Sequence, residues 1–443
     1  MTKNILHFAL ALPLIAPGLI LAQGASQLTA LRVGHLVDPE NGTVTANQIV
    51  LIQDGKFTAI GANLSIPAGA NVVDMSQYYV SPGLVDAHNH LALTYKEEPE
   101  HNSYYLTSVL DSTALRAIQA VSNGITMMSA GFTVVRDLGN NANYADTALR
   151  VAIEQGWVPG PTLINSGLII GGFGGQFTPV PERESLIYPE YLNADTNDEI
   201  IKAVRRNILY GAKVIKICVD CKSYGYTVDE MKLFVSEAAK SGLKVAGHVQ
   251  THPGAMRAIE AGIWSIEHSG ALDDEAHKAM ARKGIWRVGT ETPLTEYHTG
   301  NTPQAQDRYR RQEDGLKNAY ANHVKMAFST DADYYIPGMT RGQVVIDFLK
   351  SWKDADIPTR EILKILTING YQVSDIYDKR GPIKVGLPAD LIALRANPLE
   401  TIDTLRDVRC VMKDGVFFKK DGVMMPESFF HSGPTPPNTW RAH

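Results

Sequence analysis

Alternating hydrophobic and polar positions mark both ends of the chain as β structure. Residues 28–80 carry this alternation, and Asp54-Gly55 interrupts it where a two-residue hairpin turn is expected. Residues 390–394 and 408–419 repeat the pattern around Asp414-Gly415. Because the two segments flank a long central region with a different pattern, we predict a small β-sandwich that is built from both chain ends.

The central region alternates apolar runs of strand length with stretches of helical periodicity. In residues 227–241, for example, Met231, Phe234 and Ala238 fall on one helical stripe, and Gly242 ends the pattern. Alternation of strands and helices favours an α/β fold, here a parallel (β/α)₈ TIM barrel, with a doubly wound open sheet as the alternative. The eight candidate strands are residues 83–89, 132–137, 162–166, 214–218, 244–248, 265–268, 286–290 and 326–330.

The N-terminus predicts export. Lys3 precedes an apolar stretch that is broken by Pro13 and Pro17, and Ala22 offers a small residue for cleavage. This is the pattern of a secretory signal peptide, and a retained membrane anchor is the alternative. We therefore expect a periplasmic or secreted protein. The expected segments are a signal peptide (1–22), the N-terminal portion of the sandwich (23–80), the barrel (81–380), the C-terminal portion of the sandwich (381–424) and an extended tail (425–443).

Composition excludes several classes of protein. The net charge is −5 and there is no basic tract, so we expect no nucleic-acid partner. Beyond the signal segment, no apolar run reaches the roughly 18 residues of a membrane helix, so the mature form should not enter a membrane. Three cysteines are too few for a disulfide scaffold. We expect Cys218 and Cys221 to be packed thiols, with a small disulfide as the alternative, and Cys410 to lie in the core.

Two histidines at the end of the first barrel strand are the first chemical signal. His88 and His90 are two residues apart, so both side chains point from the same face of a strand. Imidazole is the commonest protein ligand for transition metals. A His-x-His pair alone is equally compatible with two hydrogen-bonded core histidines, so its meaning depends on other residues.

Further polar residues stand at the ends of later strands. His248 and His268 end the fifth and sixth strands, Asp331 follows the eighth, and Lys216 lies within the apolar fourth strand. In a barrel these ends converge on the face that carries the active site. A buried lysine needs an explanation, since an unpaired charge there is costly. It could be a Schiff-base or general-base amine, a carbamylated metal ligand, or a side chain that reaches solvent or an acid. Asp331 could instead cap a helix.

Together these residues resemble the amidohydrolase superfamily over nearly the whole mature chain. The motifs SPGLVDAHNH (81–90), GFTVVRDLG (131–139), SIEHSG (265–270) and STDAD (329–333) are similar to its branch of prolidase-like metallo-dipeptidases, imidazolonepropionase-like proteins and ochratoxin-hydrolysing amidases. The resemblance implies two divalent metal ions, usually zinc, bridged by a carbamylated Lys216. It implies that His88, His90 and Asp331 hold one ion and that His248 and His268 hold the other. It also implies a homo-oligomer.

Departures from the family pattern bear on the substrate. Many relatives have a Gly-Gly-His-Gly loop after the third strand, where this chain has Phe173, and a histidine where it has Gln250. These changes favour an apolar or aromatic substrate group against Phe173. Tyr224, Tyr226 and His252 lie on loops expected near the mouth and could bind a substrate carboxylate. Ordinary loop packing is the alternative for all four residues.

The predicted activity is therefore hydrolysis of an amide next to a free carboxylate. The substrate would be a dipeptide, an N-acyl amino acid or an ochratoxin-like phenylalanine amide. A hydroxide between two metal ions would attack the carbonyl, and Asp331 would act as general base and acid. The alternatives are a cyclic-amide or imidazolone hydrolase, a deaminase of the same fold, or a non-catalytic metal- or solute-binding protein.

Overall fold

The computed structural model describes residues 28–96, 103–268, 270, 272–295, 300 and 302–425. The predicted signal peptide, and all of the predicted tail except Met425, lie outside the described residues. Within those ranges, none of the helices combines the length and the apolar character that a bilayer crossing requires.

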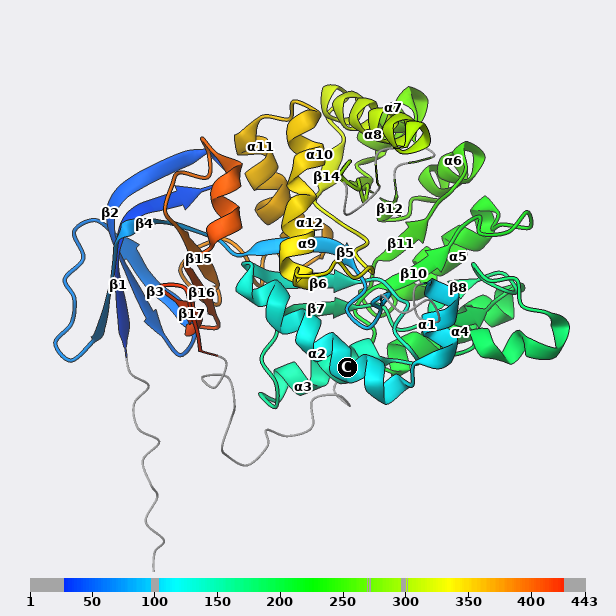
Figure 1. Ribbon diagram of the computed structural model, residues 1–443, viewed down its shortest axis with the longest axis horizontal. Helices are drawn as coiled ribbons and strands as arrows, with labels where there is room; N and C mark the ends of the chain where they lie inside the picture. Colours follow the sequence, from blue (N-terminus) through cyan, green and yellow to red (C-terminus); the bar gives the residue numbers. More distant parts are fainter. Residues whose placement is uncertain are drawn as a thin grey trace, which may run out of the picture.

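Strands from the two chain ends form one sheet, as Figure 1 shows for the blue and orange-red strands. Its order is β18-β17-β16-β15-β4-β1-β2-β3, and β15 joins the two halves by pairing antiparallel with β4. The strands are β1 (Thr29–Asp38), β2 (Thr43–Gln53), β3 (Lys56–Gly61), β4 (Asn71–Ser81), β15 (Leu391–Leu394), β16 (Cys410–Lys413), β17 (Val416–Lys420) and β18 (Val423–Met424).

Both predicted hairpin turns are confirmed, and they touch each other. Asp54-Gly55 and Asp414-Gly415 all have positive φ, between 50° and 76°, as a tight hairpin turn of this kind requires. A Cβ on Gly415 would lie 2.9 Å from the Cα of Gly55, so only glycine allows this approach. The sheet also curls back on itself, because Phe57 N donates to Leu387 O at 3.0 Å. Its separation into a two-layered sandwich domain stays a prediction.

All eight predicted central strands are present, and they pair in parallel. They are β5 (Leu84–Asn89), β6 (Phe132–Asp137), β7 (Thr162–Asn165), β10 (Ile215–Cys218), β11 (Val245–His248), β12 (Ser265–Glu267), β13 (Trp286–Val288) and β14 (Lys325–Ala327). Two further strands, β8 (Ile169–Gly171) and β9 (Tyr191–Asn193), were not predicted. The α/β class is therefore confirmed.

The central strands make two sheets because the chain bends after β7. β7 pairs with β6, whereas β8, three residues later, pairs with β10. Gly167 lies at the bend with φ +67°, and a Cβ there would meet the Tyr144 ring at 2.9 Å. The other edges meet where Ala87 N donates to Phe328 O at 2.9 Å. A regular barrel closed by one continuous sheet is thus not seen, and complete (β/α)₈ closure stays a prediction.

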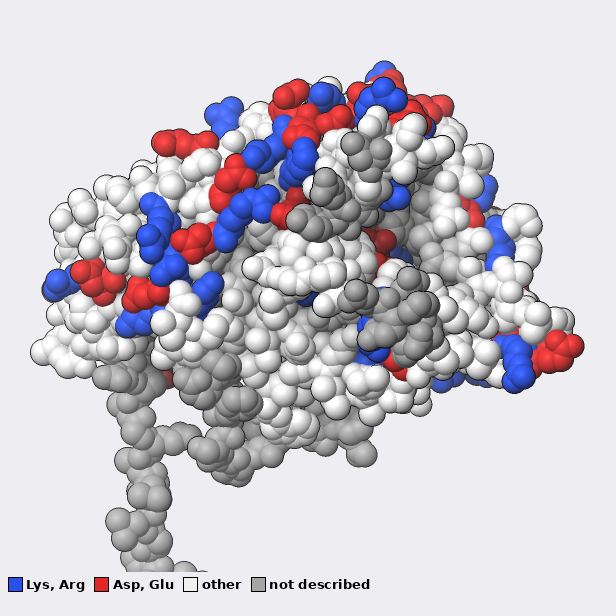
Figure 2. Space-filling model, in the orientation of Figure 1, with Lys and Arg blue, Asp and Glu red and all other residues white. Residues whose placement is uncertain are grey.

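Helices surround the central strands in Figure 1. Charged side chains of both signs alternate over the helices between residues 341 and 364, as Figure 2 shows. The predicted helix at 227–241 is α5, which a Thr227–Glu230 capping box begins. The helices are α1 (Tyr104–Leu110), α2 (Thr113–Ser129), α3 (Ala145–Glu154), α4 (Asn197–Leu209), α5 (Val228–Ala239), α6 (His252–Ala261), α7 (Asp274–Lys283), α8 (Pro303–Ala321), α9 (Arg341–Asp347), α10 (Leu349–Asp354), α11 (Thr359–Lys364) and α12 (Gly370–Val373).

Candidate metal centre and substrate cavity

The six residues that the sequence singles out converge at the carboxyl ends of β5, β10, β11, β12 and β14. The ring centroids of His88 and His268 are 5.0 Å apart, and those of His248 and His268 are 4.3 Å apart. Lys216 Nζ lies 3.4 Å from His88 Nε2. Asp331 closes the group, with Oδ1 2.7 Å from His90 Nε2. The predicted convergence is confirmed, whereas the roles of these residues as metal ligands stay a prediction.

Two of the histidines are oriented through their second ring nitrogen. His88 Nδ1 donates to Glu267 Oε2 at 2.9 Å, and His90 Nδ1 donates to Gly139 O at 2.7 Å. Each hydrogen bond leaves Nε2 as the free lone pair, which is how proteins orient metal-binding histidines. Burial opposes a charged His90, but Asp331 Oδ1, 2.7 Å from His90 Nε2, raises the pKa of this imidazole, so positive charge is favoured between the two atoms. A cation between or beside them would stabilise this arrangement.

Glu267 is a functional residue that the strand pattern did not single out. It is fully buried, and Oε1 lies 3.3 Å from Arg136 Nη2 and 2.5 Å from Ser265 Oγ. Burial opposes ionisation, but the Arg136 guanidinium and the His88 contact hold the pKa of Glu267 below its ordinary value. A charged residue inside a buried strand was the available signal, the same one that marked Lys216.

Burial keeps His88, His248 and His268 neutral, which is the form of imidazole that binds metals. Burial lowers the pKa of His88 to about 4 and that of His268 to about 3. Burial also lowers the pKa of Lys216 to about 8. No carboxylate among the described residues lies within ion-pair distance of the Lys216 amine, so this buried amine lacks a counter-ion there.

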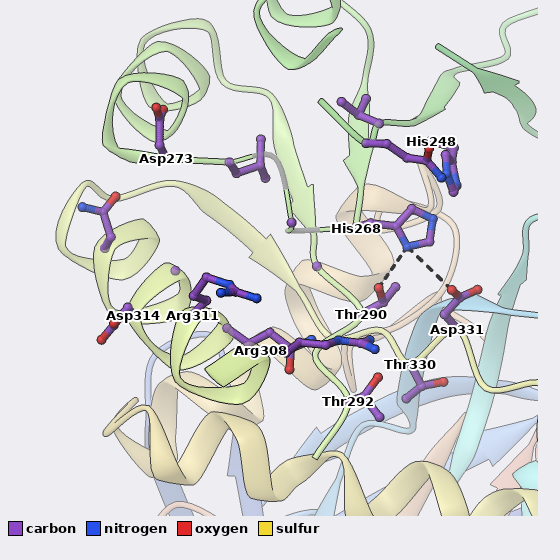
Figure 3. Close-up of a pocket in the computed structure, with 18 of the residues that line it drawn as sticks. His248, His268, Asp273, Thr290, Thr292, Arg308, Arg311, Asp314, Thr330 and Asp331 are labelled. Atoms are coloured by element: carbon purple, nitrogen blue, oxygen red, sulfur yellow. Dashed lines mark hydrogen bonds and ion pairs between the residues drawn. The ribbon is translucent and has the colours of Figure 1, made fainter. Parts of the chain in front are cut away.

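Three residues around the centre have left-handed backbone conformations. His268, Thr290 and Asp331 follow β12, β13 and β14 with φ of 70°, 56° and 55°. Such conformations cost non-glycine residues roughly 1–3 kcal/mol each and concentrate at functional sites. They aim His268 Nδ1 at Thr290 Oγ1, 3.0 Å away, and at Asp331 Oδ2, 3.6 Å away (Figure 3).

The donor set fits a divalent cation. One ligand atom each from His88, His268 and Asp331 lie within 4.8 Å of one another, in a buried to half-buried setting. Imidazole nitrogen with carboxylate oxygen suits zinc and its neighbours in the first transition row. His248 stands beside this group, where Gln176 Nε2 approaches its Nε2 at 3.3 Å.

The expectation of two packed thiols is wrong, because Cys218 and Cys221 form a disulfide with Cα atoms 5.7 Å apart. The chain turns back after β10, so that Cys221 packs against the apolar cluster of Cys218, Phe177 and Tyr191. The two sulfurs lie near His248, but bonded sulfurs do not act as thiolate ligands. Cys410 is a buried free thiol, as expected.

A cavity of about 1000 Å³ opens from the centre towards α7 and α8. His248, His268 and Asp331 line one end, and Arg308 and Arg311 of α8 line the other side (Figure 3). His88, His90 and Lys216 lie beneath this wall rather than in it. Gln250, which replaces a family histidine, lines the cavity.

The predicted aromatic substrate contacts lie elsewhere. Phe173 is 48% exposed and is absent from the described wall of the cavity. Tyr224 donates its hydroxyl to the backbone oxygen of Phe173 at 2.7 Å. Tyr226 is buried, and its hydroxyl donates to Ala194 O at 2.9 Å. Both tyrosine hydroxyls donate to backbone oxygens, and Phe173 lies outside the described wall. The prediction that these three residues contact substrate is therefore not supported.

His252 also points away from a substrate role. It begins α6, and its Nδ1 lies 3.2 Å from Asp273 Oδ2. Its other nitrogen lies 3.8 Å from Glu275 Oε2. Among the described residues the wall of the cavity does not include His252, so the predicted carboxylate contact is not supported either. Both nitrogens of the His252 ring thus lie near acidic side chains.

Comparison with known proteins identifies the class. The Amidohydrolase family model matches residues 79–417, so the chain belongs to the amidohydrolase family. It is 27% identical to an ochratoxinase of Aspergillus niger, over 92% of this chain and 90% of that protein. It is 23% identical to an imidazolonepropionase of Mesorhizobium japonicum, over 84% and 92%.

Solved structures agree with this class. A Xaa-Pro dipeptidase with methionine bound in its active site matches with a TM-score of 0.74 and 27% identity, over 89% of this chain and 100% of that one. This match supports an amidohydrolase-type fold for the chain, and complete closure of its barrel stays a prediction. The family and these relatives identify the chain as a hydrolase that acts on amide bonds.

Proposed function

We propose that this protein cleaves an amide bond next to a free carboxylate, using two divalent metal ions, with zinc favoured by their donor set. The substrate would be a dipeptide, an N-acyl amino acid or an ochratoxin-like phenylalanine amide. The observation that carries the proposal is the convergence of six N- and O-donor residues at one end of a large cavity. The names of the ochratoxinase and dipeptidase relatives support the choice of substrate class.

His88, His90 and Asp331 would hold one ion, and His248 and His268 the other, with Lys216 between them as its carbamate. Carbamylation joins the neutral amine to carbon dioxide and releases one proton, which leaves a carboxylate on Nζ. The buried amine without a counter-ion supports this assignment. Bound divalent ions would acidify water and polarise the amide carbonyl.

Asp331 would move the proton. Its carboxylate is 33% exposed, at the boundary between the buried centre and the cavity. An Oδ oxygen would accept a proton from the attacking water and pass it to the leaving nitrogen, which then departs as an amine. The contacts with His90 and His268 would hold the carboxylate in place during both transfers.

The test is a pair of substitutions with metal content measured beside activity. Asp331→Asn should lower the rate of amide hydrolysis by about 10²–10⁴-fold while much of the metal remains, because it removes the proton carrier. Lys216→Ala should abolish turnover and lower the metal content below two ions per chain. Near-normal turnover in either variant would contradict the mechanism.

Two matched controls accompany these variants. Asp314→Asn removes a carboxylate on the cavity wall, and Lys213→Ala removes an exposed amine just before β10. Both controls should keep the activity and metal content of the natural protein. Substrates should include cyclic amides, since the imidazolonepropionase relative makes ring opening the second candidate reaction.

Export and self-association complete the proposal. Residues 1–22 would direct export to the periplasm or the medium and be removed, so the N-terminus of the mature protein should lie near residue 23. The mature protein would form a homo-oligomer. N-terminal sequencing and light scattering test these two points separately.

A further inference from the structure

Helix α8 supplies the positive charge of the cavity. Arg308 and Arg311 are the two basic side chains in the described wall, and Figure 3 shows both extending from α8 into the cavity. They lie across from His268 and Asp331. A substrate that reaches the metal centre therefore passes beside this helix.

The two arginines differ in their partners. Arg311 forms an ion pair with Asp307, one turn earlier in α8. Arg308 has neither a hydrogen bond nor an ion pair with any described residue. No described residue therefore uses any of the five donors of its guanidinium, whose fork matches a carboxylate.

The acidic residues of the wall do not neutralise Arg308. Asp273 caps α7 by accepting from Ala276 N at 3.0 Å, and Asp274 pairs with Lys278 at 2.6 Å. Figure 3 shows the Asp314 carboxylate on the opposite side of α8 from the Arg308 guanidinium. The remaining carboxylates, Asp331 and Asp333, belong to the metal end of the cavity.

We propose that Arg308 binds the free carboxylate of the substrate and so selects amides of amino acids. This inference rests on the proposed function and deepens it, because it assigns the substrate carboxylate to a residue of the cavity wall, which does not include Tyr224, Tyr226 or His252. A guanidinium binds a carboxylate through two parallel hydrogen bonds. Thr292, in the same wall, adds a hydroxyl. The substrate would lie with its amide at the histidines and its carboxylate at α8.

The cavity volume indicates the size of the acyl group. About 1000 Å³ is at the upper end of the range for small-molecule sites, roughly 300–1,000 Å³. A dipeptide would leave much of this space unfilled. An amino acid that carries a bulky acyl group would use both the charge of Arg308 and the volume.

Binding of phenylalanine tests the inference without turnover. Calorimetry on the metal-loaded protein would compare phenylalanine with phenylalaninamide, which lacks the carboxylate. Arg308→Gln should weaken phenylalanine binding about 10–100-fold, the range for a lost hydrogen bond to a charged group, and leave phenylalaninamide unchanged. Arg310→Gln is the matched control, because Arg310 is an exposed arginine of the same helix outside the described wall, and it should change neither affinity by more than about threefold.

The outcomes separate this inference from the proposed function. Unchanged phenylalanine affinity in Arg308→Gln, an equal loss in Arg310→Gln, or no phenylalanine binding at all would overturn it. Hydrolysis of N-acetylphenylalanine and of its carboxamide is measured alongside. If neither is cleaved but Arg308 controls phenylalanine binding, the proposed function fails and the carboxylate site stands. If N-acetylphenylalanine is cleaved in preference to its carboxamide, and Arg308→Gln cleaves it as fast as the natural protein does, the proposed function stands and the carboxylate is bound elsewhere.

Discussion

At the scale of single residues, the candidate metal centre depends on contacts between side chains that lie far apart along the chain. His88, His248 and Asp331 could be placed together because parallel strands end on a common face. Glu267 and Arg308 could not, since their roles depend on what lies beside them in space. Glu267 contacts a histidine 179 positions away along the chain, and no spacing rule reports such a contact.

Glu267→Gln is the sharpest test at this scale. The amide keeps an oxygen that can accept from His88 Nδ1, but it loses the charge that Arg136 balances. Metal affinity should fall about 10–100-fold, the usual effect of removing such a supporting carboxylate. Competition with a chromophoric chelator measures it. Glu237→Gln is the control. Glu237 is a buried carboxylate of α5 that pairs with Arg205, away from the metal centre, so this substitution should leave metal affinity unchanged.

At the scale of elements, periodicity located strands and helices but not the break in a strand. The sequence predicts one strand at 162–166, yet the chain bends at Gly167 and forms β8 directly after β7. The bend depends on Tyr144 and Asn207, which pack where a side chain at Gly167 would lie. Only the packed structure contains that information, so the two-sheet pairing could not be predicted.

Local sequence was sufficient to predict α5. Its N-terminal capping box therefore offers a test of how much local interactions stabilise this helix. Thr227 Oγ1 accepts from Glu230 N at 3.3 Å, and the Glu230 carboxylate accepts from Thr227 N at 2.8 Å. Thr227→Ala should lower the free energy of unfolding by about 1 kcal/mol. Urea titration measures the change. Ser236→Ala, an exposed position in the same helix, should be neutral or slightly stabilising. An equal loss in both variants would contradict the capping argument.

At the scale of the whole molecule, the pairing of the chain ends was foreseen from one repeated pattern. The turns at Asp54-Gly55 and Asp414-Gly415 pack together, although about 360 residues separate them. Arg380 strengthens this region by pairing with Asp390 and with Asp414. The strand order of the joint sheet was not foreseen, because alternation specifies faces and not neighbours.

Removal of the metal ions should lower the thermal stability of the whole protein. A ligand that binds only the folded state stabilises it by about 4 kcal/mol at a thousand times its Kd, so chelation should lower Tm by several degrees. Differential scanning calorimetry with and without chelator measures this, and added zinc should restore Tm. The same chelator should shift Tm of Lys216→Ala much less. Equal shifts in both proteins would mean that the stabilising ion binds elsewhere.

The left-handed residues at His268, Thr290 and Asp331 set a limit on how this protein can change over generations. In the metal-free protein glycine would relieve the backbone strain at each position, because it adopts positive φ without strain. A lineage selected only to survive heat would therefore drift towards glycine at these positions and lose the imidazole and the carboxylate. Retention of the three larger side chains requires continuous selection for activity, so heat-adapted forms must find their added stability in the outer helices and the chain-end sheet.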